Sequence, residues 1–470
     1  MQQLTMYSLG GVDGEVTGSC HIIEYKSKKE NFKYMIDCGL HQGGENPDLK
    51  NRAFKTPFNL NELSSVILTH AHADHCGLVP VLVKEGYSGK IHSTPATRDL
   101  ASIIMLDSAK IQSHEPGTPA YTEKDAMETL NHFSCFFYGK HKRLDDNVTA
   151  TFYNAGHVLG SAFVDLAFDR YTGVSRFFHK KDEKLHVLYT GDMGRESNPL
   201  VNPPAVDMPA PDYIVMESTY GNRLHETMAT VKQELAYAVN RTVERGGKVI
   251  IPSFAVERTQ EIIYFIKGLM KDNKIPKVPV YVDSPMAINA TGVFSIHSEC
   301  FNYKIKEDFI AKGKNPFSVK SLKYVSSYQE SLQIARSKKP CIVISAQGMC
   351  EAGRVINHIK HGIGNPNNTI LIVGYMCEGT LGRKILNKAE TVAIDGKEYK
   401  LKAEVQQINA FSAHADYREM LDWLGKIDTS RLKKIFLVHG DHDAQEFFAG
   451  RLNQAGFQVE IVKKGTKYKL

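Results

Sequence analysis

Five short apolar runs in this chain each end directly at a side chain that can carry charge or bind a metal ion. These side chains are Asp37, His70, Asp192, Glu217 and His439. Apolar runs of this length, bounded by Gly or polar residues, are typical of buried strands. In α/β sheets, functional sites form outside the carboxyl ends of the strands. We therefore predict that these five strand ends share one edge and build one site.

The pattern of predicted elements changes from about residue 225 onward, where strands and helices begin to alternate. KVIIPSF, VPVYVDS, PCIVISAQG and NTILIVGY are apolar runs of strand length, and helical patterns such as ERTQEIIYFIKGLMKD separate them. This alternation predicts a mostly parallel sheet covered on both faces. The segment KAETVAIDGKEYKLKAEVQQI returns to strand, with Asp395–Gly396 as a hairpin turn. A chain of 470 residues is too long for one ordinary core, so we expect at least two domains.

Composition excludes several classes of protein. Apolar residues make up 42% and charged residues 23% of the chain, but no apolar run approaches the ~18–20 residues that span a bilayer. The N-terminus shows no basic start followed by an apolar stretch, so no secretory signal is visible. The eight cysteines form no C-x-x-C pair, which favours a reduced cytoplasmic setting. The net charge of +6 permits a polyanionic partner without requiring one.

The stretch THAHADHCG at residues 69–77 contains the pattern H-x-H-x-D-H directly after an apolar strand. In an extended loop, His70, His72 and Asp74 share a side, and a turn brings His75 around. Imidazole and carboxylate ligands suit Zn²⁺, or Mn²⁺ or Fe with more carboxylate. Four ligands within six residues crowd a single tetrahedral ion. We therefore expect two ions side by side, each completed by ligands from elsewhere.

Three other loops offer the missing ligands. His157 lies in AGHVLGS, Asp192 in TGDMGR and His439 in LVHGDHD. Each alone is indistinguishable from an ordinary loop residue, but together they have the number and chemistry that two metals need. The stretch SAHADY with His414 is only a partial echo of the first motif, because it lacks the H-x-H pair.

The order of these motifs resembles a known family. The chain is similar to metallo-β-lactamase-fold ribonucleases of the β-CASP group, above all those related to the endonuclease subunit of the cleavage and polyadenylation specificity factor and its prokaryotic relatives. The motifs that carry the resemblance are YMIDCG, THAHADHCG, AGHVLGSA, LYTGDMGR, MESTYGNR, FSAHADY and LVHGDHDAQEF. Seven motifs in the family's order are far more specific than any one of them.

The resemblance implies an α/β fold in which a metallo-β-lactamase αββα sandwich, formed by residues 1–220 and 401–470, holds an inserted β-CASP α/β domain of residues 221–400. It also implies a set of roles. One Zn²⁺ would bind His70, His72 and His157, and a second would bind Asp74, His75 and His439. Asp192 would bridge the two ions, and Asp37 would orient the bridging water or a ligand.

The implied reaction is hydrolysis of phosphodiester bonds in single-stranded RNA by a hydroxide that bridges two metals, with endonucleolytic RNA processing or decay as the expected role. His414 would protonate the leaving oxygen or stabilise charge on the phosphate, and Glu217 would orient His414. A histidine held by a carboxylate has a raised pKa and stays protonated longer, as an acid should. The expected catalytic residues are Asp37, Asp192, Glu217 and His414.

Two glycine-rich strand–helix turns are expected to contact the substrate phosphates. CIVISAQGMCEAGRVINHI contains Ser345, Gly348 and Arg354, and GYMCEGTLGRKIL contains Arg383. Backbone N–H groups at such helix starts bind anions, and arginine adds bidentate contacts. SFAVERTQ departs from the family pattern, with Glu257 where relatives usually have Gly. This departure argues against substrate contact by the next residue, Arg258.

Alternative functions stay open at this point. Two alternatives have the same fold: a 5′ exoribonuclease and a DNA-acting nuclease. The family's DNA-acting branch tends to lack a histidine at the position of His439, which this chain has. RNase J relatives carry a further C-terminal domain, for which the short segment after His439 leaves no room. An inactive scaffold of an RNA-processing complex is the alternative outside catalysis, and all seven expected ligand positions are filled. A small-molecule hydrolase such as a lactamase or thioesterase is a further alternative. The β-CASP insertion argues against it, because that domain narrows the site to a slot suited to a strand. A homodimer is an open alternative to a monomer.

Overall fold

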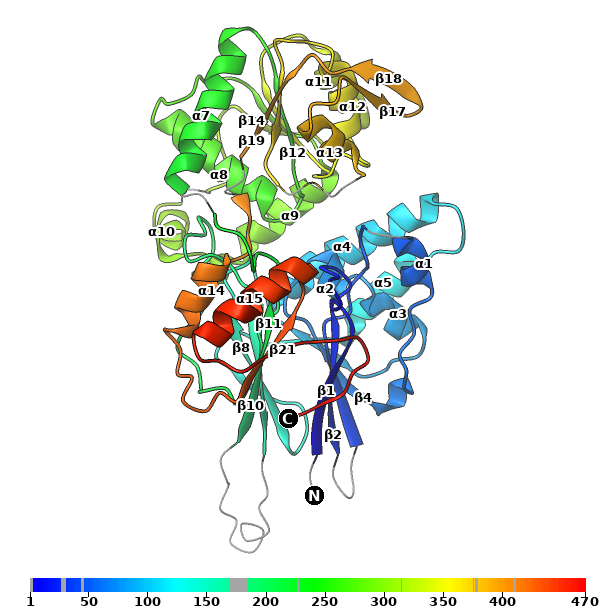
Figure 1. Cartoon of the computed structure of the whole chain (residues 1–470). Coiled ribbons are helices and arrows are strands. Elements are labelled where there is room, and N and C mark those ends of the chain that lie inside the picture. The colour runs from blue at the N-terminus through cyan, green and yellow to red at the C-terminus, as the bar shows by residue number, and fades with distance from the viewer. Residues whose placement is uncertain are drawn as a thin grey trace, which may run out of the picture. The chain divides into compact units, whose positions relative to one another are not determined.

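The structure is a computed structural model, and it describes residues 3–26, 31–43, 46–169, 184–225, 228–313, 315–374, 376, 379–408 and 411–470. The chain divides into two compact units, one formed by Met1–Leu224 with Ala413–Leu470 and the other by His225–Ser412. The first unit therefore joins the two ends of the sequence, which are blue to green and orange to red in Figure 1. We describe each unit by itself.

The first unit contains two seven-stranded sheets. In one sheet the strands follow the order β22 (Tyr468–Lys469), β1 (Gln3–Gly10), β2 (Cys20–Lys26), β3 (Asn31–Ile36), β4 (Leu63–Ile67), β5 (Lys90–Ser93) and β6 (Phe133–Cys135). In the other the order is β21 (Val459–Ile461), β20 (Lys434–Val438), β11 (Tyr213–Glu217), β10 (Leu185–Tyr189), β9 (Ala162–Phe168), β8 (Val148–Asn154) and β7 (His141–Arg143). The pairs β3–β4, β4–β5, β10–β11 and β11–β20 are parallel, so their carboxyl ends point to the same edge.

Alternating side chains of the second sheet bury its two faces against different partners. Val187 and Tyr189 of β10 lie in the core between the two sheets, whereas Leu188 packs in a second core with Met420 and Phe448. These last two belong to α14 (Tyr417–Leu424) and α15 (His442–Gln454). Figure 1 shows these two helices outside the second sheet.

The other α-helices in the described part of this unit lie on the outer side of the first sheet (Figure 1). They are α1 (Pro47–Arg52), α2 (Ala73–Cys76), α3 (Val79–Lys84), α4 (Pro95–His114) and α5 (Glu123–Thr129). The layers therefore follow the order helix, sheet, sheet, helix, and the predicted αββα sandwich is confirmed.

The second unit contains a six-stranded sheet in which every pairing is parallel. The strand order is β14 (Leu322–Tyr324), β13 (Val280–Val282), β15 (Ile342–Ser345), β12 (Val249–Pro252), β16 (Thr369–Ile372) and β19 (Glu404–Gln407). The helices are α7 (Met228–Glu244), α8 (Arg258–Lys271), α9 (Pro285–Ile296), α10 (Tyr303–Lys306), α11 (Tyr328–Arg336), α12 (Val355–Gly362) and α13 (Leu381–Leu386). The predicted parallel α/β insertion is confirmed.

A separate hairpin follows α13. The strands β17 (Thr391–Ile394) and β18 (Lys397–Lys400) pair antiparallel around Asp395 and Gly396, which have φ angles of 48° and 73°. Two consecutive residues with positive φ are typical of the type I′ turn that Asp-Gly prefers. The hairpin turn predicted at this dipeptide is confirmed.

Two expectations from composition bear on the described residues. No helix among them is both long enough and apolar enough to cross a bilayer. The cysteines in the described ranges are all free thiols, and each is buried except Cys135. Cys377 lies outside the described residues.

Candidate metal centre

The loop that follows β4 places four potential ligands at the carboxyl edge of the first sheet. The chain is extended through His70 and His72, and the short helix α2 then begins at Ala73. Asp74 and His75 therefore lie in a helical turn, so the turn expected at these two residues is present, but it begins at Ala73 and includes Asp74. This corrects the expectation that Asp74 shares a side with His70 and His72, because helix geometry rotates the Asp74 side chain away from them.

The other potential ligands come from loops of the second sheet. His157 lies between β8 and β9, Asp192 lies just after β10, and His439 directly follows β20. Because β8, β9, β10, β11 and β20 are neighbours in one sheet, these loops meet at one edge. The site predicted at one shared edge is instead built from two edges, because Asp37 and His70 follow strands of the first sheet, and the strands before Asp192, Glu217 and His439 belong to the second.

One group of side chains converges around His72. Its Nδ1 lies 3.1 Å from His70 Nε2 and 3.2 Å from His157 Nε2. Asp192 Oδ2 lies 3.4 Å from the Nε2 atoms of both His70 and His157. One ligand atom from each of these four residues falls within 4.8 Å of all the others. This spacing is compatible with a single ion among them.

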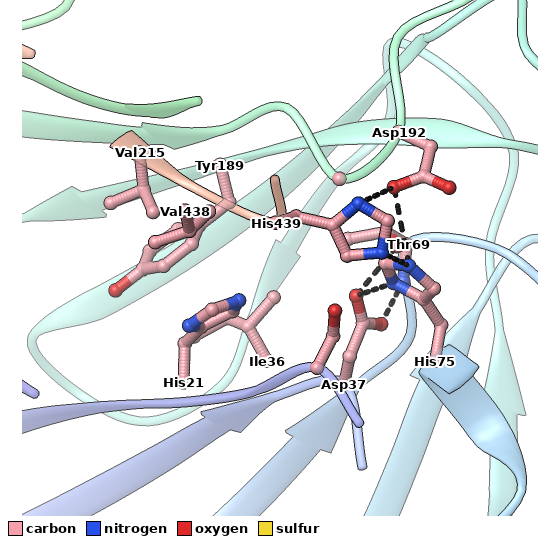
Figure 2. Close-up of a pocket in the computed structure, with 12 residues that line it drawn as sticks. His21, Ile36, Asp37, Thr69, His75, Tyr189, Asp192, Val215, Val438 and His439 are labelled. Atoms are coloured by element: carbon pink, nitrogen blue, oxygen red, sulfur yellow. Dashed lines mark hydrogen bonds and ion pairs between the residues drawn. The ribbon is translucent and has the colours of Figure 1, made fainter. Parts of the chain in front are cut away.

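A second group lies on the other side of Asp192. His75 Nε2 is 3.2 Å from His439 Nε2 and 3.2 Å from Asp192 Oδ1, and His439 Nε2 is 3.5 Å from Asp74 Oδ2. Figure 2 shows His75 and His439 side by side, with Asp192 and Asp37 beside them. Each oxygen of Asp192 therefore faces one group, as a bridging carboxylate would.

The chemistry of these groups fits bound cations. Burial lowers the pKa of His70 and His157 well below the usual range, and lowers that of His72 to about 4. His72 Nδ1 then lies 3.1–3.2 Å from ring nitrogens of two other neutral imidazoles, and a cation between them would satisfy the lone pairs of all three. Asp192 is only 2% exposed, and its Oδ1 makes no hydrogen bond. Burial raises the pKa of Asp192, but the nearby His439 and His75 outweigh it and hold that pKa well below its usual range.

Asp37 orients one ligand in each group. Its Oδ2 lies 2.7 Å from His75 Nδ1 and also accepts a 2.7 Å hydrogen bond from the Thr69 hydroxyl. Since that hydroxyl donates to Asp37, it accepts the proton of His70 Nδ1 at 3.0 Å. Both histidines are thereby held with Nε2 toward the metal groups. The Thr69 backbone N–H donates to Asp37 Oδ1 at 2.8 Å and fixes the carboxylate itself.

His414 and Glu217 form a third group beside Asp192. His414 Nδ1 lies 3.1 Å from both carboxylate oxygens of Glu217 and 3.9 Å from Asp192 Oδ2. Glu217 is 1% exposed and is held by the backbone N–H of Met193 at 2.6 Å. The segment containing His414 bridges to Gly194, and Ala415 N donates to Met193 O at 2.7 Å. The loop after β10 therefore positions the histidine and its carboxylate together.

The charge around His414 favours its protonated form. Burial lowers the pKa of His414, but the carboxylates of Glu217 and Asp192 outweigh burial and raise that pKa to about 9. Cations bound beside Asp192 would oppose the shift, so the direct Glu217 contact is the part that persists. His414 is thus built to hold a proton near neutral pH.

Comparison with protein-family models matches three successive parts of the chain. Residues 28–206 match the metallo-beta-lactamase superfamily domain, 259–385 match the Beta-Casp domain, and 398–462 match the Zn-dependent metallo-hydrolase RNA specificity domain. Ribonuclease TTHA0252 of Thermus thermophilus is 33% identical over 457 residues, which cover 97% of each chain. The chain belongs to the β-CASP ribonuclease family of the metallo-β-lactamase superfamily.

Other relatives of this β-CASP protein carry different names. Transcription termination factor FttA of Methanosarcina mazei is 32% identical over 450 residues, covering 94% of this chain and 68% of that protein. An RNase J-like protein of Methanocaldococcus jannaschii is 32% identical over 420 residues, 89% of each chain. A crystal structure of an Enterococcus faecalis protein of unknown function matches with a TM-score of 0.53 at 10% identity, covering 100% of both chains, and supports the fold alone. The match to the Zn-dependent metallo-hydrolase RNA specificity domain identifies the β-CASP protein as an enzyme of the zinc-dependent metallo-hydrolase class.

The predicted phosphate-contacting residues all lie in the β-CASP unit, but their side chains differ in availability. Arg354 is not presented to a ligand: it forms an ion pair with buried Asp283 at 2.8 Å and donates to Val325 O and Ser326 O at 2.9 and 2.6 Å. This argues against the predicted phosphate contact by Arg354, because its guanidinium already satisfies a buried carboxylate.

The other members of that set have local backbone roles. Ser345 is buried and donates its hydroxyl to Asp283 O at 2.7 Å, and Gly348 is also buried. Arg383 is half-buried, and its backbone N–H donates to Thr380 Oγ1 at 3.2 Å to cap α13. Phosphate contact by these three residues stays a prediction.

Glu257 adopts a backbone conformation that suits glycine. Its φ and ψ are 65° and −60°, and Arg258 N donates to Val256 O at 2.8 Å, which closes a γ-turn around it. Arg258 pairs with Glu261 and lies over the Phe411 ring at 5.2 Å. Both contacts lie within the β-CASP unit, and the role of Arg258 toward substrate stays untested.

Two residues important to the candidate metal centre of the first unit were missed in the sequence. Thr69 links Asp37 to His70, and Tyr220 stacks on His414 with ring centroids 5.9 Å apart. Thr69 directly precedes His70 and Tyr220 follows Glu217 by three positions. Adjacency to predicted site residues was the only available signal, since neither residue type is itself diagnostic of a metal site.

Proposed function

We propose that the chain hydrolyses phosphodiester bonds in single-stranded RNA, cutting internally, with two Zn²⁺ ions. The observation that carries the proposal is the placement of Asp192 between two groups of metal-binding side chains, with His414 beside it. The family model that describes an RNA specificity domain, and the relative named as a ribonuclease, support RNA as the substrate.

The residues that would hold the ions fall into two sets that share one member. One ion would bind the first set and the other the second, and Mn²⁺ or Fe are the alternatives to Zn²⁺. When bound, such cations supply Lewis acidity at the scissile phosphate and lower the pKa of the attacking water. The first set is His70, His72 and His157, and the second is Asp74, His75 and His439. Asp192 groups with the first set, and because its Oδ1 lies 3.2 Å from His75 Nε2, it would also serve the second.

His414 would complete the reaction as the general acid. Its Nδ1 is held by the Glu217 carboxylate, so a protonated His414 would donate its Nε2 proton to the leaving oxygen. A water that has lost one proton to solvent would attack phosphorus as hydroxide, the bond from phosphorus to the leaving oxygen would break, and that oxygen would take the proton of His414. Glu217 acts as a positioning residue, because it touches His414 and not the reacting atoms.

The acid role is tested with His414→Ala. We expect zinc content to equal that of the wild type and turnover to fall by about 10²–10⁴-fold, the usual contribution of a general acid. Zinc is measured by mass spectrometry and turnover on a short fluorescent RNA. Full turnover in this variant would rule out His414 as the acid.

The substrate and mode of cleavage are tested on one set of oligonucleotides. The protein is incubated with single-stranded RNA labelled at the 5′ or 3′ end, and with DNA of the same sequence, each with and without chelator. We expect internal RNA cuts that chelator abolishes. Stepwise loss of 5′ nucleotides indicates the 5′ exonuclease, cutting of DNA indicates the DNA-acting enzyme, and no cleavage of either indicates the inactive scaffold. Light scattering on the same sample distinguishes a monomer from a homodimer.

A further inference from the structure

An exposed aromatic ring lies where three neighbouring strands of the β-CASP sheet end. Phe254 comes two residues after β12, and 41% of its surface is exposed although the residues on either side of it are buried. The strands that flank β12 in the sheet, β15 and β16, are parallel to it. Ligand sites in parallel α/β sheets form at this carboxyl edge.

Two glycines allow the backbone to approach this ring closely. A Cβ atom at Gly348, after β15, would lie 3.0 Å from Phe254 Cδ2 and 3.1 Å from Cε2. A Cβ atom at Gly374, after β16, would lie 3.6 Å from Cε2. The Cδ2–Cε2 edge of the ring is therefore set against two glycine backbones. A side chain at Gly348 would push the ring out of this position.

The backbone that carries the ring is held in place. Phe254 O accepts hydrogen bonds from Thr259 N at 3.2 Å and from Thr259 Oγ1 at 2.8 Å. Ser253 N donates to Ser345 O at 3.0 Å, which ties the segment to β15. An aromatic side chain held on a fixed backbone loses little conformational freedom when a ligand stacks on it.

We propose that Phe254 is a stacking platform for one base of the single-stranded RNA, an inference that rests on the proposed function. Bases stack on aromatic rings regardless of sequence, which suits an enzyme that accepts an unpaired strand. One ring seated between glycine turns offers the contact area of a single base. The surrounding backbone N–H groups of the glycine-rich turns would lie near the phosphates of the same strand.

The test separates the aromatic face of Phe254 from its volume. Phe254→Leu keeps an apolar side chain but removes the ring, and Phe254→Tyr keeps the ring. Phe447, which is also 41% exposed but lies on α15, provides the matched control Phe447→Leu. Binding is measured in chelator, so that no cleavage occurs, on a set of single-stranded 10-mer RNAs with 2-aminopurine at successive positions.

We expect Phe254→Leu to weaken RNA binding about tenfold, the usual effect of losing one stacked base. It should also relieve the fluorescence quenching of 2-aminopurine at one position in the strand. Phe254→Tyr and Phe447→Leu should bind and quench as the wild type does. Equal melting temperatures of the wild type and the three variants would show that the fold is intact. If Phe254→Leu is destabilised, the wild type is tested instead with an RNA that lacks the base at the quenched position. This abasic RNA should bind the wild type about tenfold more weakly than the intact RNA does.

Two failures are distinguishable. If the wild type binds RNA and Phe254→Leu binds equally well with unchanged quenching, the platform is wrong while the proposed function stands. If the wild type neither binds nor cleaves RNA, the proposed function fails and the platform fails with it.

Discussion

Replacing Asp37 with Asn tests how the second metal group is assembled. Asp37 is 1% exposed, and one of its oxygens holds both His75 Nδ1 and the Thr69 hydroxyl at 2.7 Å. An amide N–H placed there would meet the Nδ1–H of His75 donor to donor. His75 would then have to move its proton to Nε2, the atom that faces His439. The backbone adds no obstacle, since Asn tolerates the positive φ of 60° at this position.

The expected loss of zinc affinity follows from the role of the carboxylate that is removed. Loss of a carboxylate that orients a metal-binding histidine weakens metal affinity about 10- to 100-fold. This corresponds to about 1.4–2.8 kcal/mol, at about 1.4 kcal/mol for each tenfold change. We expect the group of Asp74, His75 and His439 to take most of this loss, because Asp37 reaches His70 only through Thr69. Zinc bound per chain should fall from two toward one at limiting zinc.

The assay is a zinc titration against a chromophoric chelator at neutral pH. The chain offers a matched control in Asp165, a buried carboxylate whose two oxygens lie 3.0 and 3.1 Å from His186 Nδ1, away from the metal centre. Asp165→Asn breaks the same kind of pair and should leave zinc affinity unchanged. If Asp37→Asn binds zinc as tightly as the wild type, Asp37 does not orient the ligands and the reasoning is wrong.

Four further outcomes follow from the same structure. Because the Glu217 carboxylate raises the pKa of His414 and a general acid works only while protonated, wild-type turnover should fall as pH rises through that pKa, and Glu217→Gln should shift this fall to lower pH in a kcat–pH profile. Gly194→Ala should lower the free energy of unfolding in urea by about 1–3 kcal/mol, because the new Cβ would lie 1.8 Å from a backbone oxygen. Gly268 lies in open space within α8, so Gly268→Ala should raise the free energy of unfolding by up to about 1 kcal/mol. Asp283→Ala leaves the Arg354 guanidinium and the buried His358 ring without their carboxylate and should destabilise the β-CASP unit by about 3–5 kcal/mol, seen as an earlier unfolding step in the same urea experiment. Zinc at 100 times its dissociation constant should stabilise the fold by about 2.7 kcal/mol, so chelator should lower the melting temperature in differential scanning fluorimetry.

The strands and the metal-binding side chains were predictable because both leave local patterns in the sequence, whereas the αββα layers were predicted only from the family resemblance. Period-2 alternation in β10 places Val187 and Leu188 on opposite faces. The four ligands in THAHADHCG are spaced too closely to be ordinary surface residues. Their division between the two groups was not predictable from spacing alone, because it depends on where α2 begins.

Contacts between distant residues account for what the sequence analysis missed. Nothing near Arg354 in the sequence indicates that Asp283, 71 positions earlier, takes up its guanidinium. Thr69 shows its role only when Asp37, on another strand, lies within 2.7 Å of it. In both cases the partner is set by strand pairing, which a single sequence does not record.

The most direct test of the metal centre is anomalous diffraction at the zinc edge from crystals grown with zinc. The structure predicts two peaks per chain with Asp192 between them. One should lie among His70, His72 and His157, and the other among Asp74, His75 and His439. A single peak, or peaks away from these residues, would contradict the two-metal centre on which the proposed function depends.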